Sequence, residues 1–322
     1  MLLKDNVPLN TPLVVQAHII DKCNLRCKFC AHALNKKSFD NFGFVRGLMQ
    51  FETFKKFVNQ AKKFASKFKS INIAGIGDPL LHPNIAEFVS YAKKADVADR
   101  IEVVTNAVAL TPAMSDKLID AGADRLRISI NGLSDEDYHN NCAYRTGGVY
   151  QKILDNLTYF HEHKKNTAVY VKIMNFVVDD AEKLAKFKRD FSPIADFTNI
   201  EFVAPLYEGV DYSFVKDTSH GMRGNDIAPI KICPSPFYTM TVTADGSILP
   251  CCNYPYPLIL GNLNDSEVTE IWNGEVRKNF LREIIRGGFD SNAVCKKCYM
   301  GKYLSQPEDY LDEVADKLLE KI

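Results

Sequence analysis

Three cysteines lie close together near the start of the chain, at Cys23, Cys27 and Cys30 in the stretch DKCNLRCKFC. Soft thiolates with this Cys-x3-Cys-x2-Cys spacing select zinc, copper(I) or iron–sulfur clusters. A structural zinc site usually has four ligands, whereas a site that does chemistry keeps one position open. A four-iron cluster on three cysteines would leave one iron free for a small molecule. The alternatives are a zinc site completed by His18 or His32, and chance clustering.

A second group of cysteines lies in the last third of the chain. Four of them fit a closed site, either zinc or a fully ligated four-iron cluster, and spacing does not decide between the two. These four are Cys233, Cys251, Cys295 and Cys298. The adjacent Cys252 is not needed for four ligands. It is either a packing residue or a thiol that faces the pocket and donates a hydrogen atom.

The composition favours a cytoplasmic protein with reduced cysteines. The chain has 322 residues, 46% of them hydrophobic, with 40 Lys+Arg and 40 Asp+Glu. Balanced charge gives no whole-chain attraction to nucleic acid or to an anionic membrane. No apolar run has the length of a transmembrane helix, and the N-terminus MLLKDNVPLN lacks a signal-peptide pattern. In a reducing compartment, clustered cysteines more often indicate metal binding or catalysis than disulfides. The isolated Cys142 is predicted to be a buried apolar residue.

Strand-like and helix-like patterns alternate over the first two thirds of the chain. The predicted strands are Leu13–Ile20, Ile71–Ile76, Ile101–Thr105, Arg125–Ile130, Val169–Val178 and Asn199–Val203. The predicted helices are an apolar stripe from Phe51 to Phe68, then Asn84–Lys94, Pro112–Ala121 closed by Gly122, Gly148–His163 and Ala181–Asp190. This alternation predicts an α/β fold of parallel strands, either a partial barrel or an open doubly wound sheet.

In both of these folds the ligand site lies at the carboxyl ends of the strands. The cysteine loop follows the first strand, and Gly75–Pro79 follows the second. Thr105-Asn106 ends the third strand, and Ser129–Asn131 ends the fourth. We therefore expect these four segments to converge on one site.

The remaining sequence has a different pattern. Residues 205–232 are rich in Gly, Pro, Asp and Ser without periodicity, which predicts a long inter-domain loop. Phe237–Thr243 and Ser247–Pro250 flank Asp245-Gly246, which predicts a β-hairpin. Ser266 is predicted to cap the next helix. A last amphipathic helix, Glu308–Ile322, is predicted to pack back on the body of the protein.

The region from residue 13 to residue 204 resembles the radical S-adenosylmethionine enzymes. That family carries Cys-x3-Cys-x2-Cys after the first strand of a partial (β/α)6 TIM-like barrel, often with an aromatic residue before the third cysteine. Gly77-Asp78-Pro79 resembles the family's Gly-Gly-Glu-Pro stretch, with Ile76 for the first Gly and Asp78 for the Glu. By this resemblance, the residues that contact S-adenosylmethionine are Phe29, Gly77, Asp78, Thr105, Asn106, Ser129 and Arg145. Arg145 suits the methionine carboxylate because its planar fork matches a carboxylate.

The resemblance also implies cofactors and a reaction. Cys23, Cys27 and Cys30 would hold a [4Fe–4S] cluster whose free iron binds the amino and carboxylate groups of S-adenosylmethionine. An electron from a flavodoxin- or ferredoxin-type donor would lead to cleavage of the C5′–S bond. The resulting 5′-deoxyadenosyl radical would take a hydrogen atom from the substrate. The protein would supply orientation and a dry pocket.

The C-terminal part resembles the SPASM/twitch domains of this family. The resemblance rests on Gly246-x4-Cys251, Gly261–Leu263, Glu270–Asn273 and Cys295-x2-Cys298. Because no cysteine follows Cys298, it implies the shorter twitch form with one auxiliary [4Fe–4S] cluster on four cysteines, as in deoxy-scyllo-inosamine dehydrogenases. The predicted domains are a radical SAM barrel over 1–204, an inter-domain loop over 205–232, a small twitch domain of β-hairpin and helix over 233–303, and a C-terminal helix over 304–322.

We expect a radical enzyme that dehydrogenates or epimerises a small molecule such as a sugar or aminocyclitol. A peptide precursor is the alternative substrate, and a two-site zinc-binding protein is the alternative that is not an enzyme. A molybdopterin-type cyclase shares the barrel but ends in Gly-Gly, whereas this chain ends Glu320-Lys321-Ile322. No catalytic acid or base is assigned. The candidates, all on the predicted loop, are Glu208, Asp211, His220, Arg223 and Asp226.

Overall fold

The computed structural model describes every residue of the chain except Met1, Phe42, Phe44 and Ala228. In this part of the chain one curved sheet has the strand order β6-β5-β4-β3-β2-β1-β7-β8-β9. The strands are β1 (Val14–His18), β2 (Ser70–Ala74), β3 (Ile101–Thr105), β4 (Arg125–Ile130), β5 (Ala168–Met174), β6 (Phe197–Glu201), β7 (Thr239–Val242), β8 (Ser247–Leu249) and β9 (Gly261–Asn262). Strands β1 to β6 pair in parallel, each with its neighbour in the chain.

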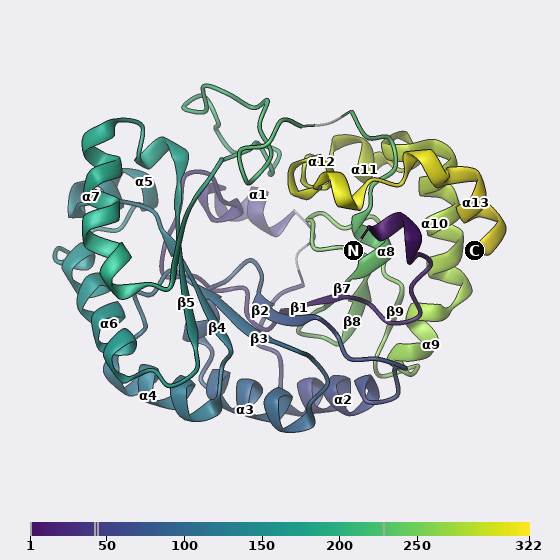
Figure 1. The fold of residues 1–322 in the computed structure, drawn as a ribbon, viewed down its shortest axis with the longest axis horizontal. Helices are drawn as coiled ribbons and strands as arrows, with labels where there is room; N and C mark the ends of the chain where they lie inside the picture. Colours follow the sequence, from purple (N-terminus) through teal and green to yellow (C-terminus); the bar gives the residue numbers. More distant parts are fainter. Residues whose placement is uncertain (1, 42, 44, 228) are drawn as a thin grey trace.

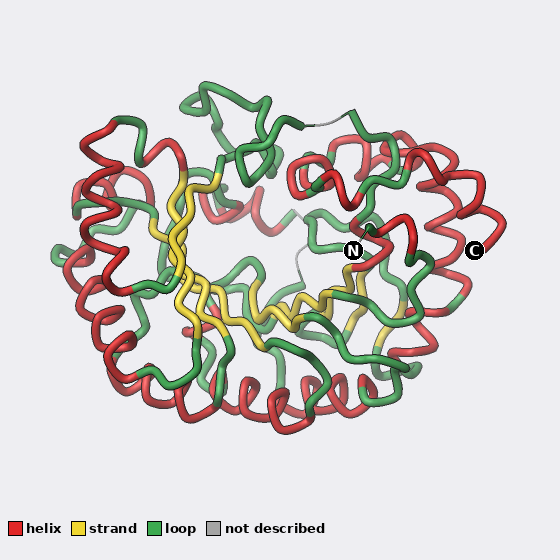
Figure 2. Tube along the Cα trace, viewed as in Figure 1, coloured by secondary structure: helices red, strands yellow, loops and turns green. Residues whose placement is uncertain are grey.

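Helices such as α2, α3, α4 and α6 cover the outer side of the curved sheet, whereas α1 and α12 lie above its inner side (Figures 1 and 2). The α-helices are α1 (Lys36–Asp40), α2 (Phe51–Ala61), α3 (Ile85–Ala95), α4 (Pro112–Ala121), α5 (Asp135–Cys142), α6 (Val149–His163), α7 (Ala181–Phe191), α8 (Ser235–Tyr238), α9 (Val268–Asn273), α10 (Glu275–Gly287), α11 (Ala293–Lys297), α12 (Met300–Leu304) and α13 (Ala315–Lys321). The predicted partial (β/α)6 barrel is confirmed, because α2, α3, α4 and α6 lie along one face of the sheet rather than on both. Among the described residues, none of the helices combines the length and the apolar character that crossing a membrane requires.

Strand β4 shows how the sequence separates the two faces of the sheet. Its exposure alternates along the strand, with Leu126, Ile128 and Ile130 buried. Alternate side chains of a strand point to opposite faces, so Arg127 and Ser129 share the inner face. The buried side chains belong to a core that includes Phe54 of α2 and Phe88 of α3.

The predicted hairpin is confirmed, and it extends the barrel sheet. β7 pairs in parallel with β1, so that Val14 lies opposite Thr239, and β8 pairs antiparallel with β7. Gly246 in the connecting turn has φ +84°, which favours glycine because it has no Cβ. The small C-terminal domain is therefore attached to the barrel by a continuous hydrogen-bonded sheet at the β1 edge.

Several predicted elements match the structure closely, but the predicted helix from Phe51 to Phe68 is too long. The predicted bounds of β3, β4 and α4 are those observed. α4 begins after Thr111, whose hydroxyl accepts from Met114 N, and ends at Gly122 with φ +79°. The predicted helix from Phe51 to Phe68 is wrong beyond Ala61. Phe68 instead lies in extended backbone that bridges to Ala98, although its side chain is fully buried.

Two C-terminal predictions are also corrected. Ser266 does not cap the helix that follows; Glu267 does, through a reciprocal capping box with Glu270. Extended backbone at Gly274 then separates α9 from α10.

The predicted helix Glu308–Ile322 is instead two short 3₁₀ turns, Pro307–Asp309 and Asp312–Val314, followed by α13. Its predicted packing is confirmed, because Leu311 and Leu318 are buried in a core with residues of α10.

Candidate functional site

The cysteine loop begins where β1 ends, and the end of β2 holds it from one side. Gly77 N donates to Ile20 O at 3.2 Å, and Asp78 N donates to Lys22 O at 2.9 Å. An added Cβ at Gly77 would lie 2.4 Å from Lys22 O, far inside van der Waals contact. Only glycine therefore allows these two backbones to approach so closely.

Helix α5, which the sequence reasoning missed, holds the loop from the other side. Arg26 N donates to Cys142 O at 2.8 Å, and Lys28 N donates to Asn141 O at 2.7 Å. The predicted burial of Cys142 is confirmed, since it is 1% exposed. Its Sγ also lies 3.5 Å from Cys27 Sγ, so this thiol touches the cysteine loop directly.

Side-chain amides from two strand ends point at the cysteine sulfurs. Asn106 Nδ2, after β3, lies 3.8 Å from Cys23 Sγ, and Asn131 Nδ2, after β4, lies 3.5 Å from Cys27 Sγ. The predicted convergence of the strand ends on the cysteine loop is thereby confirmed. Hydrogen bonds to cluster sulfurs are one way in which proteins set the reduction potential of an iron–sulfur cluster.

Asp78 is a buried junction between β2 and β3. Its carboxylate accepts from Leu80 N at 3.0 Å, from the Thr105 hydroxyl at 2.9 Å and from Asn106 N at 2.8 Å. Burial raises the pKa of Asp78, and these donors oppose the rise. The structure therefore gives Asp78 and Thr105 a positioning role, and their predicted contact with S-adenosylmethionine stays a prediction.

The other predicted contacts lie in different surroundings. Phe29 packs edge-on against Phe176 and lines the barrel cavity described below. Ser129 stands on the inner face of β4, beside Lys172 of β5. Arg145 lies on an exposed loop after α5 and does not line that cavity, so its proposed carboxylate contact gains no support.

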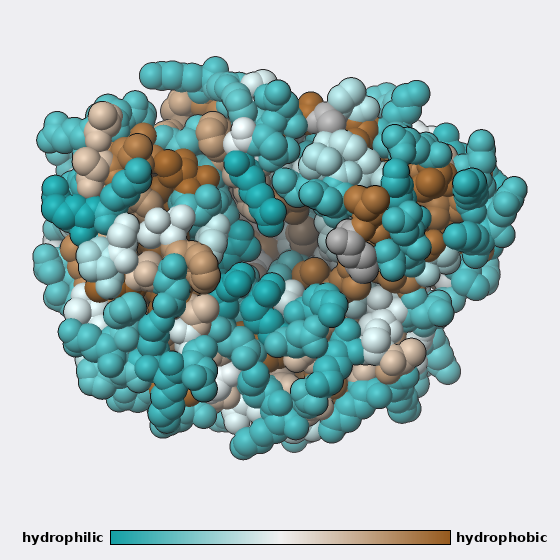
Figure 3. Space-filling view, viewed as in Figure 1, coloured by the Kyte–Doolittle hydropathy of each residue, from teal (hydrophilic) through white to brown (hydrophobic). Residues whose placement is uncertain are grey.

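A cavity of about 310 Å³ fills the inner side of the barrel. Figure 3 shows a hollow near the middle of the face in view. The cavity reaches from Cys30 of the cysteine loop to Cys252 of the small C-terminal domain. Its apolar walls include Phe29, Ile76 and Met300. This volume lies at the lower end of the range of small-molecule sites.

A histidine–tyrosine pair lies in the cavity wall where the barrel meets the small domain. His18 Nδ1 lies 2.6 Å from the Tyr254 hydroxyl, and the two rings stack with their centroids 5.4 Å apart. Burial lowers the pKa of His18 to about 4, so the ring is neutral at physiological pH. Both side chains line the cavity.

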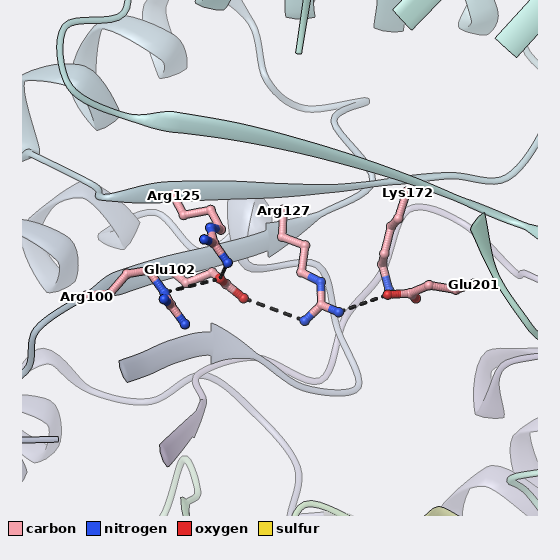
Figure 4. Close-up of polar contacts among 6 residues, drawn as sticks. All are labelled: Arg100, Glu102, Arg125, Arg127, Lys172 and Glu201. Atoms are coloured by element: carbon pink, nitrogen blue, oxygen red, sulfur yellow. Dashed lines mark hydrogen bonds and ion pairs between the residues drawn. The ribbon is translucent and has the colours of Figure 1, made fainter. Parts of the chain in front are cut away.

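Charged side chains from three adjacent strands line another part of the same wall (Figure 4). Glu201 of β6 accepts from Arg127 Nη2 at 2.8 Å and from Lys172 Nζ at 2.5 Å. Burial alone would raise the pKa of Glu201, but the two facing cations outweigh it and the pKa lies below its usual value. Glu201 is therefore ionised and paired on both oxygens.

The acid–base candidates predicted on the loop do not line the cavity. Glu208 pairs with Lys297 at the surface, and Asp226 is almost fully exposed. His220 pairs with Asp217, while Asp211 and Arg223 are exposed. The loop reaches the cavity instead through Leu206, Tyr207 and Met222. The charged wall and the His18–Tyr254 pair were missed, although polar residues at alternate positions in Arg125–Ile130 were a signal for an inner, functional face.

The C-terminal cysteines come together around a second, smaller cavity. Cys233 precedes α8, Cys251 follows β8, and Cys295 and Cys298 lie at α11. All four line a cavity of about 30 Å³, together with apolar residues such as Phe280 and Phe289. Cys252 lines both this cavity and the barrel cavity.

Both cysteine sites fit iron–sulfur clusters by donor type and surroundings. Burial raises the pKa of Cys23, Cys30 and Cys295 to about 12, so cluster binding has to displace thiol protons. Near the second site, an added Cβ at Gly301 would lie 2.7 Å from Cys233 Sγ, so the backbone closes tightly on the thiol.

The histidines proposed for a zinc site have other partners. His18 contacts Tyr254, and His32 Nε2 lies 2.9 Å from Ile76 O. In the described part of the chain, no three His, Cys, Asp or Glu side chains are arranged to hold a single metal ion.

Comparison with known proteins agrees with this architecture. An AdoMet-dependent heme synthase from Methanosarcina barkeri is 23% identical over 94% of this chain and 95% of its own. The structure resembles BtrN in complex with AdoMet and 2-DOIA, with a TM-score of 0.55 and 17% identity over 89% of this chain and 92% of that one. It also resembles Streptococcus suis SuiB bound to precursor peptide SuiA, with a TM-score of 0.63 and 15% identity over 97% and 77% of the two chains. These structural likenesses show the fold.

Family profiles match both parts of the chain. Residues 18–188, more than half of the sequence, match the radical SAM superfamily. Residues 233–299 match the SPASM iron–sulfur cluster-binding domain. The cofactors are therefore a [4Fe–4S] cluster with S-adenosylmethionine, and an auxiliary iron–sulfur cluster. The chain belongs to the radical SAM superfamily and carries a SPASM domain after its barrel.

Proposed function

We propose that this radical SAM enzyme acts on a small molecule bound in the barrel cavity, and that it dehydrogenates or epimerises that molecule. The observation that carries the proposal is the cavity itself, about 310 Å³ between Cys30 and Cys252. This volume lies in the range of small-molecule sites, which supports a substrate of the size of a sugar or an aminocyclitol.

In this proposal Cys23, Cys27 and Cys30 hold the first cluster, which supplies the electron that cleaves S-adenosylmethionine to a 5′-deoxyadenosyl radical. Asn106 and Asn131 orient their amides toward the sulfurs of Cys23 and Cys27. Phe29 and the other apolar walls exclude water, which protects a reactive radical from side reactions. A flavodoxin- or ferredoxin-type protein is the proposed electron donor.

The second site offers two outcomes for the substrate radical. Cys233, Cys251, Cys295 and Cys298 would hold the auxiliary cluster, which would accept the one electron that the substrate radical loses when dehydrogenation is completed. His18 and its Tyr254 partner then lie in the wall as a pair that can hydrogen-bond to a substrate hydroxyl group. Cys252 borders both cavities, so in the alternative reaction its thiol would return a hydrogen atom and complete an epimerisation, and the thiyl radical left on Cys252 would take an electron from the auxiliary cluster and a proton from solvent.

A peptide substrate is the second candidate, because the fold is also that of SuiB, a protein seen bound to a precursor peptide. The test is formation of 5′-deoxyadenosine by the anaerobically reconstituted, reduced enzyme. A pool of neutral, amino and acidic sugars is expected to stimulate it, and short peptides are not. Stimulation by peptides alone would contradict the small-molecule proposal.

The product then separates the two reactions. Loss of two mass units indicates dehydrogenation, whereas an unchanged mass indicates epimerisation. If Cys252 returns the hydrogen atom, reaction in D₂O should place one deuterium in the product, because a thiol proton exchanges with solvent. The Cys252→Ser variant should then still cleave S-adenosylmethionine but lose the epimer. Product without deuterium, or unchanged product from Cys252→Ser, would rule out that role.

A further inference from the structure

The inner wall of the barrel carries more positive than negative charge. Glu102 of β3 lies within 3.7 Å of three guanidinium groups, those of Arg100, Arg125 and Arg127. Arg127 also pairs with Glu201, which pairs with Lys172 (Figure 4). The six side chains hold four cations and two carboxylates, so the network has a net charge of +2.

The two carboxylates of this network are buried, whereas the side chains of Arg100, Arg125 and Arg127 are 39%, 30% and 26% exposed, and only part of the network faces the cavity. Of the six residues, Arg127, Lys172 and Glu201 line the cavity, and Glu201 is the one acidic residue among the described residues of its wall. The side chain of Lys172 is 14% exposed and that of Glu201 is 2% exposed. A buried charge costs several kcal/mol unless it is paired. All four cations lie in ion pairs, but the two carboxylates can neutralise only two of the four positive charges.

The two cations at the cavity also have donors left over. Lys172 Nζ can donate three hydrogen bonds and gives one to Glu201. Arg127 gives one hydrogen bond, from Nη2 to Glu201, while its Nη1 lies 3.7 Å from Glu102. Since Glu201 is already paired on both oxygens, it is poorly placed to receive an ammonium group from a ligand.

We infer that Arg127 and Lys172, held in place by Glu201, bind an anionic group of the substrate, a carboxylate or a phosphate. The inference rests on the proposed function, in which the substrate occupies the barrel cavity, and it narrows the substrate class. The substrate is an acidic small molecule, such as a sugar acid or a sugar phosphate, rather than a neutral or amino sugar. A guanidinium and an ammonium side by side are the usual donors for these anions.

The first test needs no knowledge of the substrate. Inorganic phosphate is titrated calorimetrically into the reconstituted enzyme, and its dissociation constant is compared among variants. Lys172→Met should weaken phosphate binding about tenfold or more, as loss of a charge-assisted hydrogen bond does. Lys172→Arg should retain binding. Arg125→Met, a control in the same network that does not line the cavity, should stay within about twofold.

Glu201→Gln separates an anion site from a structural ion-pair network. It removes the carboxylate that neutralises both cations, so phosphate should bind several-fold more tightly. A purely structural network would be disturbed by the change and would bind phosphate no better. Phosphate binding that is absent, or that is unchanged by Lys172→Met, would overturn the inference.

The remaining test is catalytic. Glucose 6-phosphate should stimulate 5′-deoxyadenosine formation more than glucose or glucosamine, and Lys172→Met should lose this preference. The dissociation constant of S-adenosylmethionine should change less than twofold in Lys172→Met. If that constant rises tenfold instead, the cation serves the methionine carboxylate and the inference is wrong. Stimulation by neutral or amino sugars alone would refute the anion site only, whereas no 5′-deoxyadenosine under any condition would refute the proposed function.

Discussion

The closest backbone contact at the cysteine loop gives a sharp prediction for Gly77→Ala. The added Cβ would lie 2.4 Å from Lys22 O, 2.6 Å from Ile20 O and 2.8 Å from Lys22 N. These three atoms are backbone atoms that no side-chain rotation can move away. The loop must therefore shift, and the hydrogen bonds from Gly77 N and Asp78 N to the loop must lengthen or break.

The magnitude follows from these contacts. Overpacking costs about 1–3 kcal/mol, and each weakened hydrogen bond costs about 1 kcal/mol. We expect a loss of roughly 3–5 kcal/mol, which for a chain of 322 residues lowers the melting temperature by about 4–7 °C. The larger effect should be local, because Cys23 immediately follows the displaced Lys22. Iron should fall from about eight to about four atoms per chain, with only the auxiliary cluster retained.

The assay is iron quantification, melting temperature and 5′-deoxyadenosine formation on reconstituted protein, with Gly147→Ala as the matched control. An added Cβ at Gly147 would meet only Asp135 Oδ2, at 4.0 Å, so this variant should stay within about 0.5 kcal/mol of the original protein. A Gly77→Ala protein with full iron and full cleavage of S-adenosylmethionine would show that this close contact does not hold the cysteine loop in place.

Three further predictions address the clusters and the cavity. Cys233→Ala should remove about four irons per chain without stopping cleavage of S-adenosylmethionine, whereas Cys252→Ser should keep all of its iron. Equal losses of iron in the two variants would contradict the choice of Cys233 over Cys252 as a cluster ligand. Asn131→Ala should lower the reduction potential of the first cluster by ~40 mV, because one hydrogen bond of about 1 kcal/mol corresponds to this shift in a one-electron couple. An unchanged potential in redox titrations would show that the Asn131 amide does not hydrogen-bond to the sulfur of Cys27. The His18 pKa of about 4 lies below its unfolded value of about 6.5, so the unfolded chain binds more protons between these pH values and stability falls as pH falls. Between pH 7 and pH 5 the original protein should therefore lose about 2 kcal/mol more unfolding free energy than His18→Gln does. Denaturant titrations in which the two proteins lose the same free energy over this pH range would contradict the prediction.

The parts of the fold that depend on local patterns could be predicted from the sequence. β3, β4 and α4 have the predicted bounds because alternation, Thr111 at the start of the helix and Gly122 at its end are signals within a few residues. The stripe from Phe51 to Phe68 was misleading because burial of Phe68 comes from its bridge to Ala98, a contact between segments. The positions of apolar residues alone do not distinguish a helix that continues to Phe68 from an extended segment that other contacts bury.

The parts of the site that depend on distant contacts could not be predicted. The pairing of β1 with β7 joins residues more than 200 positions apart, and it brings Tyr254 against His18. The pairs of Glu201 with Arg127 and Lys172 likewise join three strands. Cys142 and α5 were missed as supports of the cysteine loop, because their role lies in backbone contacts to Arg26 and Lys28. The convergence of the strand ends could be predicted because parallel strands share one carboxyl edge.

We propose that the cysteine loop and the barrel cavity form one centre for cleavage of S-adenosylmethionine. The most direct measurement compares 5′-deoxyadenosine and metal content in the anaerobically reconstituted protein and in Cys30→Ala. We predict about eight irons and 5′-deoxyadenosine from the reduced wild-type chain, and about four irons with no 5′-deoxyadenosine from the variant. A protein that binds two zinc ions, takes up no iron and forms no 5′-deoxyadenosine would contradict the proposed iron–sulfur centre.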